Sequence, residues 1–197
     1  MVIGCLFGTF DPPHRAHVAI AAHMRDHRSL DQVWLVVTPA NPFKADQMIS
    51  PENHRLAMVR LALIKQEGLQ ASGIELDLSR PNYTVDSLKF LRMRWPQDEF
   101  QLIIGSDNFA TLHTWKGTED ILDNHKVLVY PRPGFGTHLM TTPFRDHGSI
   151  DIVADAPLMD VSSTEIRRAI RDWRPVRDLI DESVLSYIRQ HQLYINV

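Results

Sequence analysis

Short runs of apolar residues recur along this chain, and several of them end at a glycine or at a proline-containing turn. Uninterrupted apolar runs of about four to eight residues are typical of strands that are buried on both faces of a parallel sheet. The pattern therefore predicts strands at residues 2–7, 33–37, 74–78, 100–105, 127–130 and 150–153.

Between these runs the apolar residues recur every three or four positions, which is the period of a helix with one buried face. This spacing predicts helices at residues 16–24, 51–65, 85–93, 162–172 and 183–190. Ser50 followed by Pro51 is typical of a helix start, because proline is tolerated at the first helical position. Ser162 with Glu165 three residues later matches a capping box, which marks another helix start.

Strands that alternate with helices predict an α/β fold: a Rossmann-like, doubly wound and mainly parallel sheet with a small C-terminal helical segment from about residue 162. A chain of 197 residues is expected to form one domain, residues 1–197. In such sheets, ligands bind beyond the carboxyl ends of the strands. Gly8, Thr38, Gly105 and Pro131 all follow predicted strands, so the loops that begin there should share one rim.

Composition adds limits on location and partners. The net charge of -3 gives no reason to expect a nucleic-acid partner. No run approaches the roughly 20 apolar residues that span a bilayer, and the start lacks a signal-peptide pattern, so we expect a soluble cytoplasmic protein without a membrane partner. The one cysteine, Cys5, lies inside an apolar run, which predicts a buried structural thiol. Nothing in the sequence indicates an oligomeric state.

The segment GTFDPPHRAH, from Gly8 to His17, combines a strand-ending glycine, two prolines and two histidines three residues apart. A glycine there allows close approach of the backbone to a ligand, and the helix that follows presents N–H groups with partial positive charge. Histidines in the first helical turn can donate to a phosphate. Structural histidines and a metal site are the alternatives, although no cysteine or carboxylate clearly completes a metal-ligand set. The P-loop pattern is absent.

Two further segments carry candidate chemistry. VSSTEIRR, residues 161–168, is either a well-capped helix with solvated arginines or a second anion-binding helix start. In IIGSDNFATLHTWK, residues 103–116, Asp107 can accept hydrogen bonds from ribose hydroxyls. Trp115 lies in a polar setting, where its ring either stacks on a heteroaromatic ligand or packs in the core.

Taken in order, GTFDPPHRAH, NPFK, PNYTVDSL, IIGSDNFATLHTWK, ILDN, RPG and VSSTEIR closely resemble the motifs of the bacterial nicotinate-nucleotide adenylyltransferases. The resemblance extends over essentially the whole chain. GTFDPPH alone indicates the nucleotidylyltransferase superfamily, which shares an HxGH-type signature with class I aminoacyl-tRNA synthetases. The tryptophan segment, PNYTVDSL and SSTEIR together narrow the resemblance to the pyridine-nucleotide branch.

The resemblance implies an enzyme of NAD biosynthesis that transfers the adenylyl group of ATP to nicotinate mononucleotide, giving nicotinate adenine dinucleotide and pyrophosphate. Mg²⁺ would be the cofactor and would travel with the ATP phosphates, without a dedicated metal site in the protein. One alternative is the same transfer to nicotinamide mononucleotide or another phosphate acceptor. A second is a nucleotide-binding sensor without catalytic activity.

The resemblance also assigns site residues, position by position. The implied catalytic residues are His14, His17 and Arg167. The implied ATP-binding residues are Gly8, Thr9, Phe10, Gly105, Asp107, Ser163 and Thr164. The implied mononucleotide-binding residues are Asn41, Lys44, Thr84, Trp115, Lys116 and Arg132.

Two positions depart from the family pattern. Phe7 stands where the family commonly has the first of two glycines, and a phenylalanine would be strained if this position required a positive φ. Ala16 stands where a glycine usually precedes the second histidine, so its methyl group is expected to approach the adenosine more closely.

Overall fold

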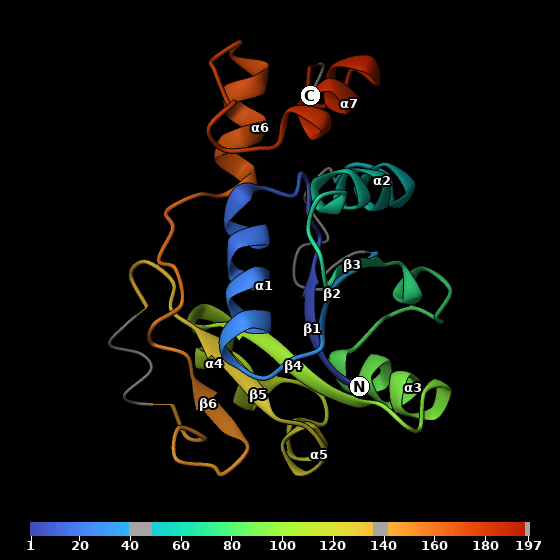
Figure 1. Cartoon of the computed structure of the whole chain (residues 1–197), viewed down its shortest axis with the longest axis vertical. Coiled ribbons are helices and arrows are strands. Elements are labelled where there is room, and N and C mark those ends of the chain that lie inside the picture. The colour runs from blue at the N-terminus through green and yellow to red at the C-terminus, as the bar shows by residue number, and fades with distance from the viewer. Residues whose placement is uncertain (40–48, 136–141, 196–197) are drawn as a thin grey trace.

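The protein is built on one sheet of six parallel strands in the order β3-β2-β1-β4-β5-β6 (Figure 1). The structure is a computed structural model, and it describes residues 1–39, 49–135 and 142–195. The strands are β1 (Val2–Gly8), β2 (Gln32–Val37), β3 (Leu69–Ser72), β4 (Glu99–Gly105), β5 (Val127–Tyr130) and β6 (Ile150–Ile152).

The strand order is that of a doubly wound Rossmann-like sheet, which confirms the predicted fold class. The order reverses between β1 and β4, because the chain first builds outward to β3 and then crosses back. The carboxyl ends of β1 and β4, at Gly8 and Gly105, therefore flank the point where such sheets bind ligands.

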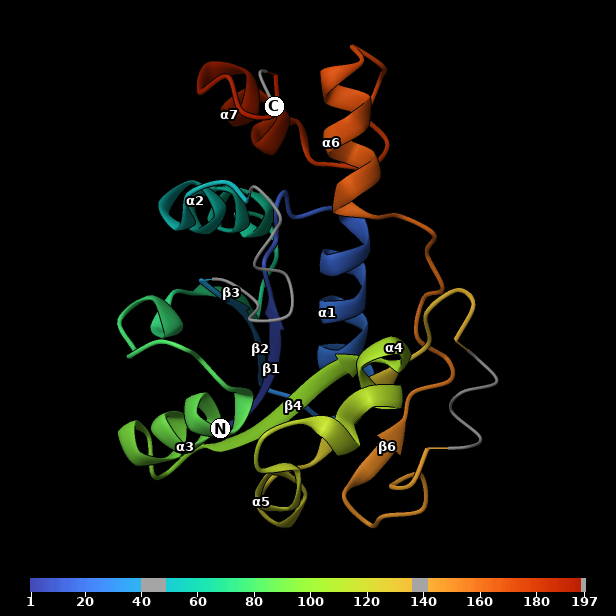
Figure 2. The same ribbon diagram turned by 180° about the vertical axis from the view of Figure 1, so that it is seen from behind.

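Helices cover both faces of the sheet, as Figures 1 and 2 show. The helices are α1 (Arg15–His27), α2 (Glu52–Leu63), α3 (Thr84–Arg94), α4 (Ser106–Thr111), α5 (Thr118–Asn124), α6 (Ser163–Arg171) and α7 (Glu182–Gln190). The described residues also form two short 3₁₀ helices, η2 (Ile74–Leu76) and η3 (Leu112–Thr114). The predicted helix starting at Pro51 begins one residue later, with Pro51 as its N-cap.

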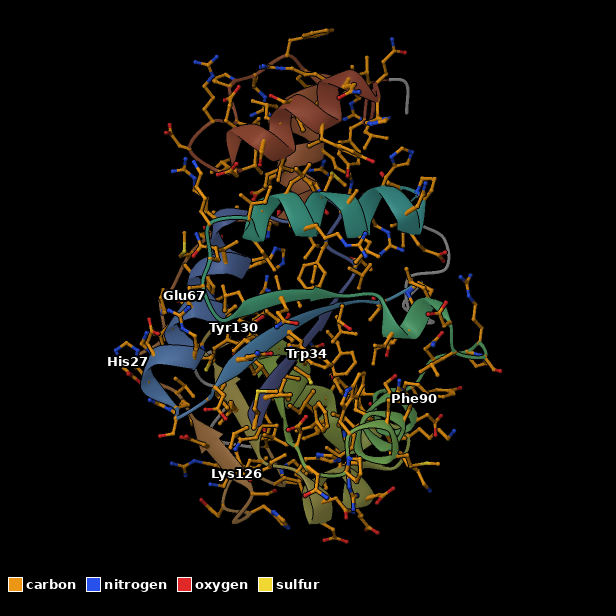
Figure 3. The ribbon with its side chains drawn as sticks, turned by 45° about the vertical axis from the view of Figure 1, so that its right-hand side comes forward. His27, Trp34, Glu67, Phe90, Lys126 and Tyr130 are labelled. Carbon is orange, nitrogen blue, oxygen red and sulfur yellow. The ribbon has the colours of Figure 1, made fainter. Side chains whose placement is uncertain are left out.

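Successive side chains along each strand point to opposite faces of the sheet, and they pack into two separate hydrophobic cores. In β1, Leu6 packs with Met24 of α1 on one face, whereas Cys5 packs with Leu88 of α3 on the other. Cys5 is fully buried, and burial raises the pKa of its thiol, as a structural cysteine requires. Trp34 and Tyr130 lie within the body of the sheet, whereas Phe90 lies on the outer side of α3 (Figure 3).

A third, smaller core joins the C-terminal helices to α2. Ile166 of α6 and Ile188 of α7 pack with Met58 of α2. Figure 3 shows α2 between the sheet and α7, so α2 connects the sheet to the predicted C-terminal helical segment. Among the described residues, no helix has both the length and the apolar character needed to cross a membrane.

The strand predicted at residues 74–78 is wrong. The third parallel strand of this half lies earlier, at Leu69–Ser72, and Ile74–Leu76 forms a 3₁₀ helix after Gly73. The strand was hard to predict because β3 is a short edge strand, in which buried Leu69 is followed by exposed Gln70. The sequence reading also named no helix at α4 or α5, which follow β4 within the stretch that carries Asp107 and Trp115.

Candidate active site

The loop between β1 and α1 is shaped by Gly8 and Phe10. Phe10 adopts a left-handed backbone (φ 49°), and its ring is 2% exposed. A Cβ atom at Gly8 would lie 3.0 Å from this ring, so glycine lets the ring fold back against the strand end without a tight contact. Phe7 belongs to β1, and Phe10 rather than Phe7 carries the positive φ, so the strain considered for Phe7 does not arise.

The two histidines of the loop stack on each other at the start of α1. Their ring centroids lie 3.6 Å apart, and His14 is the extended N-cap of the helix. The backbone N–H of His14 donates to Nδ1 of His17 over 3.2 Å. A ring nitrogen that accepts a hydrogen bond carries no proton, so a neutral His17 must carry its proton on Nε2. His17 therefore offers an N–H donor without being charged.

Burial keeps both histidines neutral. Desolvation, with the positive charge of Arg132 as a smaller cause, lowers the pKa of His14 to about 4. Desolvation, with His14 and Arg132 as further causes, also holds the pKa of His17 well below its usual value. Nδ1 of His14 is buried without a hydrogen-bond partner. A bound anion would supply the missing partner by accepting a hydrogen bond from the N–H form of this nitrogen.

This depressed pKa predicts a pH-dependent stability. Because folded His14 has a pKa of about 4 against an ordinary 6.5, the unfolded chain binds more protons between these values. The free energy of unfolding should therefore fall by about 3 kcal/mol from this group as the pH drops through that window. Urea unfolding at several pH values checks this. A His14→Asn variant should lose less stability on acidification, and an equal loss in both proteins would contradict the assignment.

Helix α6 brings a second N-terminus to the same loop. Its N-cap Ser162 accepts from the N–H of Glu165, which confirms the predicted N-cap, and Ser162 Oγ also donates to Glu165 Oε2 over 2.9 Å. Ser163 Oγ donates to the carbonyl of Pro12 over 2.9 Å, and Arg167 donates to the carbonyl of Asp11 over 2.8 Å.

Figure 1 shows α1 and α6 end to end at this point, with their N-termini adjacent. A second guanidinium N–H of Arg167 donates to Thr164 Oγ1 over 3.3 Å. The structure thus brings two anion-attracting helix ends, two histidines and an arginine together.

Gly105, at the end of β4, lies beside the side chains of Asp107 and Arg132. A Cβ at Gly105 would lie 2.4 Å from Asp107 Oδ1 and 2.7 Å from Arg132 Cδ, so a larger residue there would displace these two side chains. Arg132 pairs with Asp107 at 3.6 Å, and its charge acts on both histidines. Oδ1 of Asp107 is buried without a partner. The sequence reading grouped Arg132 with Trp115, whereas the structure places it beside Asp107 on the histidine side.

Thr84, Trp115 and Lys116 form a separate group. Thr84 opens α3, and Lys116 lies over the ring of Tyr83 at 4.5 Å and pairs with Asp86 at 2.8 Å. Trp115 is partly buried and packs against the core beneath α3, and its carbonyl accepts from Thr118. The segment with Trp115 therefore adjoins the N-terminus of α3, where unpaired N–H groups attract a negative charge.

Arg55 of α2 is a site-building residue that the sequence analysis missed. Its side chain is fully buried and donates to the carbonyls of Thr9 and Thr38, each at 2.7 Å. It also donates to the carbonyls of Pro39 (2.7 Å) and Ser50 (2.9 Å). Burial lowers the pKa of its guanidinium, which the negative charges of Asp11 and Glu52 partly counteract. Arg55 thereby ties the loops after β1 and β2 together.

Two of the implied mononucleotide residues, Asn41 and Lys44, lie outside the described residues. Within the described part of the chain, no group of three or more His, Cys, Asp or Glu side chains is arranged to hold a metal ion. The candidate site combines the guanidinium groups of Arg132 and Arg167 with the N–H donors of two helix starts, a donor set suited to phosphate groups.

Known proteins share this sequence over nearly its full length. A family model described as cytidylyltransferase-like matches residues 5–169. A relative from Christiangramia forsetii, named probable nicotinate-nucleotide adenylyltransferase, is 41% identical over 192 residues, covering 98% of this chain and 97% of the relative. A relative of the same name from Flavobacterium psychrophilum is 42% identical, with 98% and 99% of the two chains covered.

Solved structures agree in fold. The nicotinic acid mononucleotide adenylyltransferase of Plasmodium falciparum, solved in a complex with NaAD, matches with a TM-score of 0.78 at 19% identity, covering 98% of this chain and 97% of that one. At this identity the match speaks for the fold alone. The family model and the bacterial relatives show that the chain belongs to the cytidylyltransferase-like family and, within it, to the nicotinate-nucleotide adenylyltransferases.

Proposed function

We propose that this protein transfers the adenylyl group of ATP to nicotinate mononucleotide, giving nicotinate adenine dinucleotide and pyrophosphate. The observation that carries this proposal is the meeting of two helix N-termini with His14, His17 and Arg167 at one loop. These groups suit a polyphosphate. The group around Thr84 and Trp115 offers a ring and N–H donors that suit a pyridine carboxylate.

In the reaction, a phosphate oxygen of the mononucleotide attacks the α-phosphorus of ATP. The new O–P bond forms as the bond to pyrophosphate breaks, so no covalent enzyme intermediate and no general base are required. Positioning and charge stabilisation carry the chemistry. This agrees with the neutral histidines, because Nε2–H of His17 can stabilise the charge on the α-phosphate without giving up its proton.

The other residues take roles around this centre. Gly8, Thr9 and Phe10 line the nucleotide site through their backbone. Ser163, Thr164 and Arg167 hold the outer phosphates and the departing pyrophosphate. Gly105 and Asp107 meet the adenosine, and the pairing of Arg132 with Asp107 adds a positive charge on the same side.

The pyridine ring stacks on Trp115, and its carboxylate meets N–H groups near Thr84 and Lys116. Asn41 and Lys44 are proposed to contact the phosphate of the mononucleotide, with Arg132 as a further candidate.

Mg²⁺ enters this scheme with the substrate. Mg²⁺ prefers oxygen ligands, keeps several waters, and binds commonly through substrate phosphates. The carboxylate of Asp11 is occupied by Tyr194 and by the N–H of Ser50, and that of Asp107 pairs with Arg132. The phosphate oxygens of ATP are thus the natural ligands, and the metal would neutralise the charge of the departing pyrophosphate.

Pyrophosphate release tests the function directly. The purified protein should release pyrophosphate from ATP and Mg²⁺ when nicotinate mononucleotide is added, and chromatography should show the dinucleotide. The N-terminus of α3 presents N–H donors, which favour a carboxylate over a neutral amide, so nicotinamide mononucleotide should be the poorer acceptor. Equal or better turnover with nicotinamide mononucleotide would contradict the proposal that nicotinate mononucleotide is the preferred acceptor. No turnover with any mononucleotide would contradict the proposed adenylyl transfer.

A further inference from the structure

Asp11 lies in the middle of the histidine loop, but its carboxylate has no role in the chemistry described above. The residue is 3% exposed. Its Oδ1 accepts a 2.6 Å hydrogen bond from the hydroxyl of Tyr194, and its Oδ2 accepts from the N–H of Ser50 at 3.2 Å. The carboxylate thus faces the interior, where it holds together segments that are far apart in the sequence.

The backbone of the same stretch holds the phosphate-binding groups of α6. The carbonyl of Asp11 accepts from Arg167, and the carbonyl of Pro12 accepts from Ser163. His14 follows two residues after Pro12. Any shift of Asp11 therefore moves the oxygen that orients Arg167, and it also moves the N-cap of α1.

Tyr194 is held firmly enough to act as a fixed point. It follows α7, is 7% exposed, and packs in the C-terminal core, with its hydroxyl 4.0 Å from Met58 Sδ. The N–H of Leu193 donates to the carbonyl of Ile188, which fixes the chain just before it. Tyr194 adopts φ 68°, a backbone that a bulky side chain rarely takes, so surrounding contacts determine its place.

We propose that Tyr194 is a positioning residue for the ATP phosphates: through the carboxylate of Asp11, its hydroxyl fixes the loop that orients Arg167 and His14. The proposal rests on the proposed function, because it assumes that these groups bind ATP. According to this proposal, the C-terminal segment positions active-site residues in addition to packing in the third core. Burial and the nearby charge of Asp11 raise the pKa of Tyr194, so its hydroxyl remains a donor.

Tyr194→Phe tests this with little change of shape. A hydrogen bond to a buried carboxylate is lost, so kcat/KM for ATP should fall about tenfold, while KM for the mononucleotide stays unchanged. The matched control is Tyr187→Phe, which removes a hydroxyl from the same core. The hydroxyl of Tyr187 contacts His54 at 3.0 Å and not the loop, so its loss should leave both constants unchanged.

A double-mutant cycle with Arg167→Ala separates positioning from general stability. If Tyr194 acts through Arg167, then Tyr194→Phe should reduce kcat/KM much less in the Arg167→Ala background than in the wild type. Additive losses would overturn the proposal. A Tyr194→Phe protein that melts at the assay temperature would assign the hydroxyl to folding and would overturn it as well.

A measurement of ATP-analogue affinity separates the test of the positioning role from the test of the proposed function. Calorimetry with a non-hydrolysable ATP analogue should show about tenfold weaker binding to Tyr194→Phe than to the wild type, whichever acceptor the enzyme uses. If the wild type makes no dinucleotide but this difference remains, the proposed function fails and the positioning role stands. Equal affinity in both proteins overturns the positioning role, whatever the activity.

Discussion

His17→Ala should lower kcat for adenylyl transfer by about 10²-fold or more, the loss typical when a preorganised donor to a developing charge is removed. The geometry gives the reason. The N–H of His14 occupies Nδ1 of His17, so Nε2 is left as the donor, and we propose that it donates to the α-phosphate. The melting temperature should change little, since His17 lies in the first turn of α1 and is not part of the hydrophobic cores.

A conservative variant tests whether a neutral donor is sufficient. His17→Gln keeps an uncharged N–H group near the position of Nε2, so it should retain at least about tenfold more activity than His17→Ala. Kinetic assays with saturating mononucleotide separate kcat from KM for ATP. Turnover of His17→Ala close to that of the wild type would refute the role, and equal losses in both variants would show that charge, and not a neutral donor, is required.

The fold was largely predictable because its strands are apolar runs that end at glycines or prolines. β1, β2, β4, β5 and β6 lie where the runs predicted them. The sequence did not predict β3, because an edge strand buries only part of its length and the segment LQAS is too short to show a hydrophobic period. The sequence did not predict α4 and α5, the helices between β4 and β5, because each spans only one or two turns.

The site was predictable as far as it consists of local motifs. His14, His17, Ser163 and Arg167 stand in short segments whose spacing alone indicates helix starts, and the structure brings them together. The bond between Asp11 and Tyr194 joins residues 183 positions apart, and no local pattern encodes such a contact. The tautomer of His17 likewise depends on a backbone N–H, which the sequence cannot reveal.

Arg55 did leave a signal in the sequence. It precedes Met58 and Val59 by three and four positions, which places it on the buried face of α2. A charged residue at a position where the period requires an apolar one indicates that its charge has partners inside the protein. The four carbonyl groups that it contacts belong to loops, and their convergence could be found only in three dimensions.

Replacement of Arg55 by methionine should destabilise the protein by about 3–5 kcal/mol, because methionine fills the space but donates no hydrogen bond. The carbonyls of Thr9, Thr38 and Pro39 would then lose their shared donor inside the protein. For a chain of this length the melting temperature should fall by about 10 °C or more. Turnover should also fall at temperatures where the variant is folded, since Thr9 belongs to the loop that we propose binds the nucleotide.

Arg60→Met provides the control on the same helix, because Arg60 is exposed and its loss should change stability by less than about 0.5 kcal/mol. Arg55→Lys keeps the charge but not the planar fork, so it should lie between the wild type and Arg55→Met. Thermal unfolding followed by circular dichroism ranks the variants. If Arg55→Met and Arg60→Met had the same melting temperature, the buried guanidinium would not be what ties the loops after β1 and β2 together. Backbone contacts, such as the hydrogen bond from the N–H of Thr38 to the carbonyl of Gly8, would then have to hold these loops.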